Sequence, residues 1–241
     1  MPQHTVAAFD EELTFLAHKI AEMGGHAERM VSGAVHALIH SDTEEAQRIV
    51  TSDLYLDECQ RAIDDKAVEI IARRQPMASD LREIIAAIRI SADLERVGDL
   101  SKNTAKRVLA AADAGTNIRL ARGIEHLNEL ALGQLKDVLD AFGTRTVDRL
   151  KLIRDRDDEI DAMYTSLFRE LLTYMMEDPR KITACTHLLF CAKNIERIGD
   201  HATNIAESVY YMVSGDTMPT YRPKDDTSHR IVANPPEVDD E

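Results

Sequence analysis

The chain has 241 residues, of which 44% are hydrophobic, 30% are charged and only 5% are aromatic, with no tryptophan. These values fit one large or two small soluble domains packed through aliphatic side chains, rather than an aromatic-rich recognition surface. The formal net charge of −14 argues against nucleic acid as a partner, because such an interface needs clustered lysine and arginine; it fits a protein that binds cations or basic partners.

Apolar residues recur every three or four positions through the first third of the chain, which predicts long amphipathic helices. The first helix is expected over residues 5–40, where Gly24 and Gly25 mark a mild kink or a close contact with another helix. The sequence Ser-Asp-Thr-Glu at 41–44 forms a capping box. It predicts that a second helix starts there and ends near residue 74.

A third helix is expected over residues 79–112, after a turn at Pro76, and Gly115 ends it. The following half repeats this plan, with helices expected over residues 117–142, 146–176 and 179–215. Asp178 is the expected N-cap of the last helix. No segment has the period of two that a strand needs, so the chain is predicted to be all-α.

Two acidic motifs each occur twice. Glu-Arg-aliphatic-Gly-Asp stands at 95–99 and again at 196–200, and Asp-x-x-aliphatic-Asp stands at 53–57 and 157–161. Long helices joined by short turns pack antiparallel. The sequence therefore predicts two duplicated three-helix bundles related by a pseudo-twofold axis, residues 1–115 and 116–215. A proline-rich, acidic and flexible tail is expected over residues 216–241.

The acidic motifs are candidate metal sites, because residues four apart on a helix lie on one face and bring two carboxylates together. The glycine before the last acid leaves room for another backbone or for a bound ion. The candidate ligands are Asp53, Asp57, Glu95 and Asp99 in the first half and Asp157, Asp161, Glu196 and Asp200 in the second. Oxygen donors of this kind suit Mg²⁺, Mn²⁺, Ca²⁺ or iron, with zinc also possible, and do not choose among them.

Three further residues are weaker candidates. Asn103 and Asn204 offer additional oxygen ligands, and His201 is either a ligand or a surface histidine. The surface position is favoured because the first half has Leu100 at the matching place. Two readings without metal remain open: a solvated acidic face, or a scaffold in which Arg96 and Arg197 neutralise the acids.

Little in the sequence indicates catalysis. The Glu-x-x-His pairs of ferritin-like di-metal bundles are absent from the sequence, as are a nucleophile elbow and a glycine-rich phosphate loop. The chain is therefore expected not to be an enzyme. A metal-dependent oxidase or hydrolase is the alternative that the acidic clusters leave open.

The three cysteines, Cys59, Cys185 and Cys191, contain no C-x-x-C pair, which suits a reducing cytosol. Cys185 and Cys191 are expected to be small core residues. The first ten residues lack a signal-peptide pattern, and no apolar run approaches the ~20 residues of a membrane span. The expected location is the cytoplasm, with contact to a membrane only through a partner.

The residues quoted above, together with Arg74-Gln-Pro-Met-Ala-Ser-Asp-Leu-Arg82 and Thr173-Tyr-Met-Met-Glu-Asp178, resemble the PhoU family of regulators of bacterial phosphate uptake. The resemblance extends to about Gly215 and excludes the tail. It implies two three-helix bundles whose acidic motifs bind metal clusters, at the eight carboxylates named above. The two halves differ at one position of the motif: Leu100 follows the first copy, whereas His201 follows the second. Equal metal binding in the two halves is therefore not implied.

The resemblance also implies a function. Such a protein is a non-enzymatic cytoplasmic adaptor that restrains the phosphate-starvation response. Its implied partners are a sensor histidine kinase at the membrane and the ATPase subunit of the phosphate ABC transporter. Homodimers are common in the family.

Overall fold

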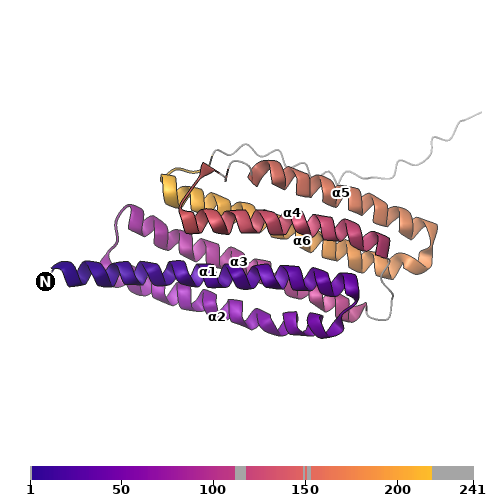
Figure 1. Cartoon of the computed structure of the whole chain (residues 1–241), viewed down its shortest axis with the longest axis horizontal. Coiled ribbons are helices and arrows are strands. Elements are labelled where there is room, and N and C mark those ends of the chain that lie inside the picture. The colour runs from indigo at the N-terminus through magenta and orange to yellow at the C-terminus, as the bar shows by residue number, and fades with distance from the viewer. Residues whose placement is uncertain (1, 112–117, 149, 151–152, 219–241) are drawn as a thin grey trace, which may run out of the picture.

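The computed structural model describes residues 2–111, 118–148, 150 and 153–218. It contains α1 (Pro2–His40), α2 (Thr43–Arg74), α3 (Ser79–Ala110), α4 (Ile118–Thr144), α5 (Ile153–Glu177), a short 3₁₀ turn η2 (Pro179–Lys181) and α6 (Ile182–Ser214) (Figure 1). Over these residues there is no β-strand. The prediction of an all-α chain built from six long helices is confirmed.

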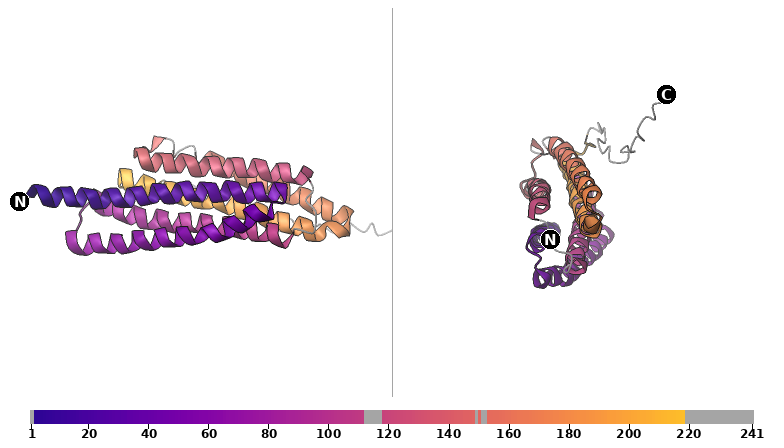
Figure 2. Two further views of the ribbon diagram at one scale, coloured as in Figure 1. Left: turned by 60° about the horizontal axis from the view of Figure 1, so that its bottom comes forward. Right: turned by 90° about the vertical axis from the view of Figure 1, so that its right-hand side faces the viewer.

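The helices form two groups of three that lie against each other (Figures 1 and 2). Helices α1, α2 and α3 pack on one another, and so do α4, α5 and α6. The two groups meet where α3 contacts α6 and α1 contacts α4, which leaves α2 and α5 on the outer sides. At 1.5 Å per residue, α3 and α6 are each about 50 Å long, so the shared interface extends along most of the molecule.

The spacing of apolar residues explains why α2 packs along its whole length against the neighbouring helices. Ile49, Leu56, Ile63 and Ile70 are seven positions apart in turn, and all four side chains are buried. A heptad repeat keeps such residues on one side of a helix. Burying each of them stabilises the fold by roughly 1.5–3 kcal/mol, and this stripe faces α1 and α3.

Several predicted helix boundaries need correction. The cap of α2 is Asp42 and not Ser41: an oxygen of the Asp42 side chain accepts a hydrogen bond from the backbone N–H of Glu45 at 2.9 Å. Ser41 instead has a φ of 54° and reverses the chain direction. A residue in the left-handed region cannot adopt the extended backbone of an N-cap, so the cap moves one residue along.

The second half also departs from the predicted boundaries. Helix α4 continues through the expected turn to Thr144, and α5 begins at Ile153, seven residues later than predicted. Asp178 caps η2, because its side chain accepts a hydrogen bond from the backbone N–H of Arg180 at 3.1 Å, and α6 starts only at Ile182. The predicted ends near Gly115 and residue 117, and the boundary between 115 and 116, lie outside the described residues.

Gly24 marks a close contact and not a break. Helix α1 is continuous, and a Cβ added at Gly24 would come within 2.8 Å of the Leu139 side chain on α4. Cys185 and Cys191 are buried, as predicted, and burial raises the pKa of the Cys191 thiol to about 12.

Most of the predicted tail lies outside the described residues, which end at 218. The part that is described does not begin as a free tail, because Met218 is only 8% exposed. Among the described helices, none is both long and apolar enough to cross a membrane.

Candidate functional site

In the first group of helices, the acidic motifs of α2 and α3 face one another around a lysine. The Lys102 ammonium lies 2.5 Å from Asp53 Oδ2 and 2.5 Å from Asp99 Oδ1. The Asp53 side chain is only 6% exposed, so its charge is shielded from water and needs this partner. The hydrogen bonds to the two carboxylates outweigh the effect of burial and raise the pKa of Lys102, which therefore stays charged.

Glu95 completes this cluster. Burial raises the pKa of its carboxyl group, and the negative charges of Asp99, Asp57 and Asp53 raise it further. Arg96 opposes this effect: its guanidinium lies 3.6 Å from Glu95 and 3.4 Å from Asp99. The structure thus brings the four acids of the first half into one electrostatic cluster, which we call the first carboxylate cluster (Asp53, Asp57, Glu95 and Asp99).

Gly98 allows α2 and α3 to come this close. A Cβ added at Gly98 would overlap the side chain of Leu56 and lie 3.3 Å from Asp53 Oδ1. A larger residue would push the two helices apart and separate the carboxylates. The glycine of the repeated motif is therefore part of the site.

In the second group, α5 packs against α6 in the same register as α2 against α3, but the acidic residues have different partners. Ile160 of α5 lies against Gly199 of α6, as Leu56 lies against Gly98. Asp157 accepts a hydrogen bond from the Thr203 hydroxyl at 3.0 Å, and Lys193 lies 2.9 Å from Glu196. We call Asp157, Asp161, Glu196 and Asp200 the second carboxylate cluster. A hydroxyl occupies the place where the first half has an ammonium.

Sequence reasoning missed Lys102 and Thr203. These residues lie 101 positions apart, the same shift that relates the two Glu-Arg-aliphatic-Gly-Asp motifs. Extending the repeat comparison three residues past Asp99 and Asp200 would have found them. It would also have shown that the two clusters differ at this position.

The weaker candidates lie elsewhere. His201 Nδ1 is 2.9 Å from Asp93 Oδ1, and the Asn204 amide donates a hydrogen bond to the same oxygen at 3.4 Å. Both contacts join α6 to α3, and the His201 side chain is only 18% exposed. The prediction of a surface histidine is therefore wrong. Asn103 is exposed and, within the described residues, has no hydrogen bond to the cluster, whereas its neighbour Lys102 contacts it.

The fit of the first carboxylate cluster to a metal ion depends on Lys102. Among the described residues, no three Asp, Glu, His or Cys side chains are arranged as a ready metal site. Two carboxylates nevertheless converge within 2.5 Å of a single positive charge. The carboxylate oxygens fit a hard cation, provided that the lysine turns away.

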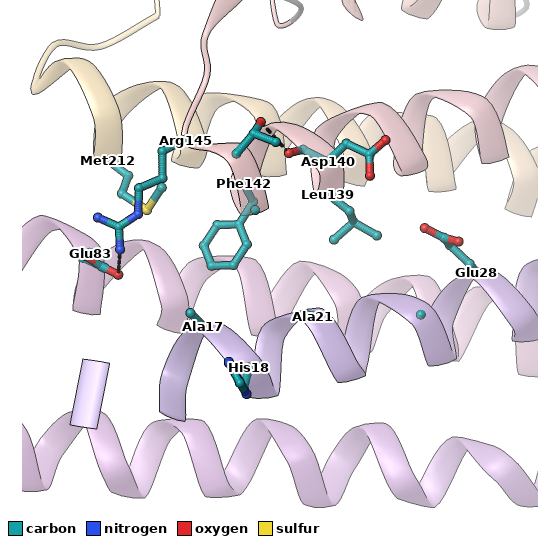
Figure 3. Close-up of a pocket in the computed structure, with 13 residues that line it drawn as sticks. Ala17, His18, Ala21, Glu28, Glu83, Leu139, Asp140, Phe142, Arg145 and Met212 are labelled. Atoms are coloured by element: carbon teal, nitrogen blue, oxygen red, sulfur yellow. Dashed lines mark hydrogen bonds and ion pairs between the residues drawn. The ribbon is translucent and has the colours of Figure 1, made fainter. Parts of the chain in front are cut away.

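A groove lies between α1 and α4, near the contact of the two helix groups (Figure 3). Its volume is about 500 Å³, and Phe142 and Leu139 line its apolar part. At one end Arg145 pairs with Glu83 of α3 at 2.5 Å. Burial raises the pKa of Glu83, and the charge of Arg145 partly offsets this effect. The ion pair ties the end of α4 to the first group of helices.

Comparison with known proteins gives one match for each of the two groups of helices. The model of the PhoU domain matches twice, over residues 20–108 and 124–209, once in each group of helices. The chain belongs to the PhoU family. A PhoU homologue of Rhizobium meliloti (strain 1021), described as a phosphate-specific transport system accessory protein, is 64% identical over 95% of this chain and 96% of its own length. One from Caulobacter vibrioides, with the same description, is 49% identical over 93% and 97%.

Solved PhoU structures have the same fold. The crystal structure of PhoU from Pseudomonas aeruginosa matches with a TM-score of 0.83 and 38% identity, over 86% of this chain and all of that chain. The phosphate transport system regulatory protein PhoU from Streptococcus pneumoniae matches with a TM-score of 0.80 and 29% identity, over 88% of this chain and all of that one. The family resemblance of the motifs is confirmed over both halves.

Proposed function

We propose that this protein is a non-enzymatic accessory protein of a phosphate-specific transport system and a negative regulator of phosphate uptake and phosphate-starvation signalling. The observation that carries this proposal is the 64% identity, over 95% of the chain, to a protein described as an accessory of such a system. The fold agrees with that role, because PhoU crystal structures match it along their whole length.

The adaptor role assigns two kinds of partner: the ATPase subunit of the phosphate ABC transporter and a sensor histidine kinase. The arrangement of the helices supports this assignment. Because α2 and α5 lie on opposite outer sides, the molecule offers two similar but separate faces, one per group of helices. The net charge of −14 favours basic surfaces on both partners. We propose that the protein acts in the cytoplasm as a homodimer.

The carboxylate clusters are proposed to hold divalent or iron-type metal ions such as Mg, Mn, Fe or Zn. In the first cluster Asp53, Glu95 and Asp99 would hold the ion after Lys102 turns out, and Asp57 would add a fourth oxygen donor. The second cluster, Asp157, Asp161, Glu196 and Asp200, has no lysine at the matching place. A bound ion would cancel the repulsion of the acids and provide a fixed positive charge for docking.

Deletion of the gene tests the regulatory role. In medium rich in phosphate, a phosphate-repressed reporter is expected to become active in the deletion strain and to be silenced again by the wild-type gene. Unchanged reporter activity and unchanged phosphate uptake after deletion would contradict the proposal. A complementing gene with Asp53→Asn and Asp99→Asn asks separately whether the first carboxylate cluster matters for signalling.

The enzymatic alternative, a ferritin-like oxidase or a metal-dependent hydrolase, has less support. Such an enzyme needs an open coordination position beside its metal. The relatives at 64% and 49% identity are described as accessory proteins of a transport system and not as enzymes. Metal-loaded protein should consume no oxygen and hydrolyse no phosphate ester. Turnover that disappears in Asp53→Asn would favour the enzyme instead.

A further inference from the structure

The last turns of α1 carry two histidines on one face. His36 and His40 are four residues apart, and their ring centroids are 4.3 Å from each other with an angle of 46° between the planes. No other two of the nine histidines in the sequence are four positions apart. Both residues are exposed, and within the described part of the chain neither ring has a hydrogen bond or an ion pair.

This geometry suits chelation. Neutral imidazole nitrogen binds zinc at about 2.0–2.1 Å, and two histidines four apart on a helix present their nitrogens to one ion, as in zinc-binding helices. Because neither His36 nor His40 is held by another side chain, small rotations about their side-chain bonds can turn both nitrogens toward a common point. Nitrogen donors select zinc, nickel and copper over magnesium and calcium.

The surroundings favour a positive ion. Helix α1 ends at His40, and its last carbonyl groups carry a partial negative charge. The next helix begins with the carboxylate of Asp42, followed by Glu44. A hydrogen bond from the backbone N–H of Glu45 lowers the pKa of Asp42, and the nearby His36 contributes in the same direction. Asp42 is therefore ionised and lies within electrostatic range of the histidine pair.

We propose that His36 and His40 bind one zinc-type divalent ion at the C-terminal end of α1, with water in the remaining coordination positions. This site is separate from the carboxylate clusters in position and in donor type, and it does not rest on the regulatory role. Binding fixes the last turn of α1 next to the left-handed Ser41 at the turn into α2.

Calorimetric titration of the untagged, full-length protein with zinc chloride tests the proposal. His36→Ala and His40→Ala should each weaken one binding event by at least about tenfold, since even the loss of an outer partner of a ligand costs about 10–100-fold in affinity. The matched control is His126→Ala, an exposed histidine on α4 with no second histidine beside it, which should leave that event unchanged. Equal zinc affinity in the wild type and in both α1 variants would overturn the proposal.

Two further measurements keep the carboxylate clusters apart from this site. Asp53→Asn with Asp99→Asn should retain the event that the histidine variants lose, and its loss in this variant would overturn the proposal. In NMR spectra of the wild type, the imidazole signals of His36 and His40 should shift together with zinc and stay unchanged with magnesium. Zinc-insensitive imidazole signals would likewise overturn it.

Discussion

Lys102 is the residue on which the chemistry of the first carboxylate cluster depends. It supplies the positive charge that allows Asp53 to be buried beside other acids. A metal ion would supply the same charge, so the lysine and the ion compete for one place. This competition makes the lysine a direct probe of the metal proposal.

Replacing Lys102 should therefore destabilise the protein, and a bound metal ion should restore the lost stability. We expect Lys102→Ala to lower the free energy of unfolding by about 1–3 kcal/mol in chelator, because a buried charge loses its partner. Added Mn²⁺ should restore most of that loss, as measured by urea denaturation. The control is Lys106→Ala, an exposed lysine one turn further along α3. An equal loss for both variants, with no effect of Mn²⁺, would contradict the prediction.

Glu95 gives a dependence on pH. Burial and its acidic neighbours raise its pKa above the ordinary 4.5, so the folded state binds the proton more tightly than the unfolded state. Ionised Glu95 therefore destabilises the fold at pH values above its raised pKa. The penalty shrinks as the pH falls below that pKa and is gone below the unfolded value of 4.5. In chelator, Glu95→Gln should be more stable than the wild type at pH 7 and equal to it near pH 3. A constant difference at all pH values would contradict this.

The sequence predicted the residues of the first cluster better than their partners. The spacing of four in both motifs and the antiparallel order of the helices were enough to place Asp53 beside Asp99. The lysine was missed because a residue three positions further along a helix looks like ordinary surface charge. His201 was misplaced because its position depends on how the two groups of helices meet, and no local pattern encodes that contact.

At the level of the helices, the close contact of α2 and α3 is set by Gly98. Gly98→Ala should lower the free energy of unfolding by about 1 kcal/mol: overpacking costs about 1–3 kcal/mol, and the better helix propensity of alanine returns roughly 1 kcal/mol. Gly143→Ala is the control, since its added methyl group would meet nothing within 4 Å. A Gly98→Ala protein more stable than the wild type would show that α2 and α3 can separate freely.

The existence of the helices was easier to predict from the sequence than their exact ends. Apolar periodicity located every long helix, because burial of a continuous stripe decides where a helix exists. The exact ends depended on single residues in unusual conformations, such as Ser41 with φ 54° and Arg145 with φ 53°. Neither residue type signals a left-handed conformation, so the start of α2 and the end of α4 could not be placed from sequence alone, whereas the end of α1 at His40 was predicted correctly.

For the whole molecule, we expect the contact between the two groups of helices to make the chain one cooperative unit. Asp93 accepts hydrogen bonds from two residues of α6 across this contact. Asp93→Ala leaves His201 and Asn204 without that acceptor and should cost about 1–3 kcal/mol. We expect the wild type to unfold in a single transition in urea, and the variant to unfold at lower urea. The control is Asp80→Ala, at the start of α3, whose carboxylate accepts a hydrogen bond from the adjacent Ser79 and, among the described residues, from none of α6. An equal effect there would contradict the assignment.

A crystal soaked with Mn²⁺ and measured by anomalous scattering is the most direct test of metal binding at the first carboxylate cluster. We expect a peak within coordination distance of Asp53, Glu95 and Asp99, with the Lys102 side chain turned out of the cluster. A crystal with no peak there, in which Lys102 still joins Asp53 to Asp99, would contradict it.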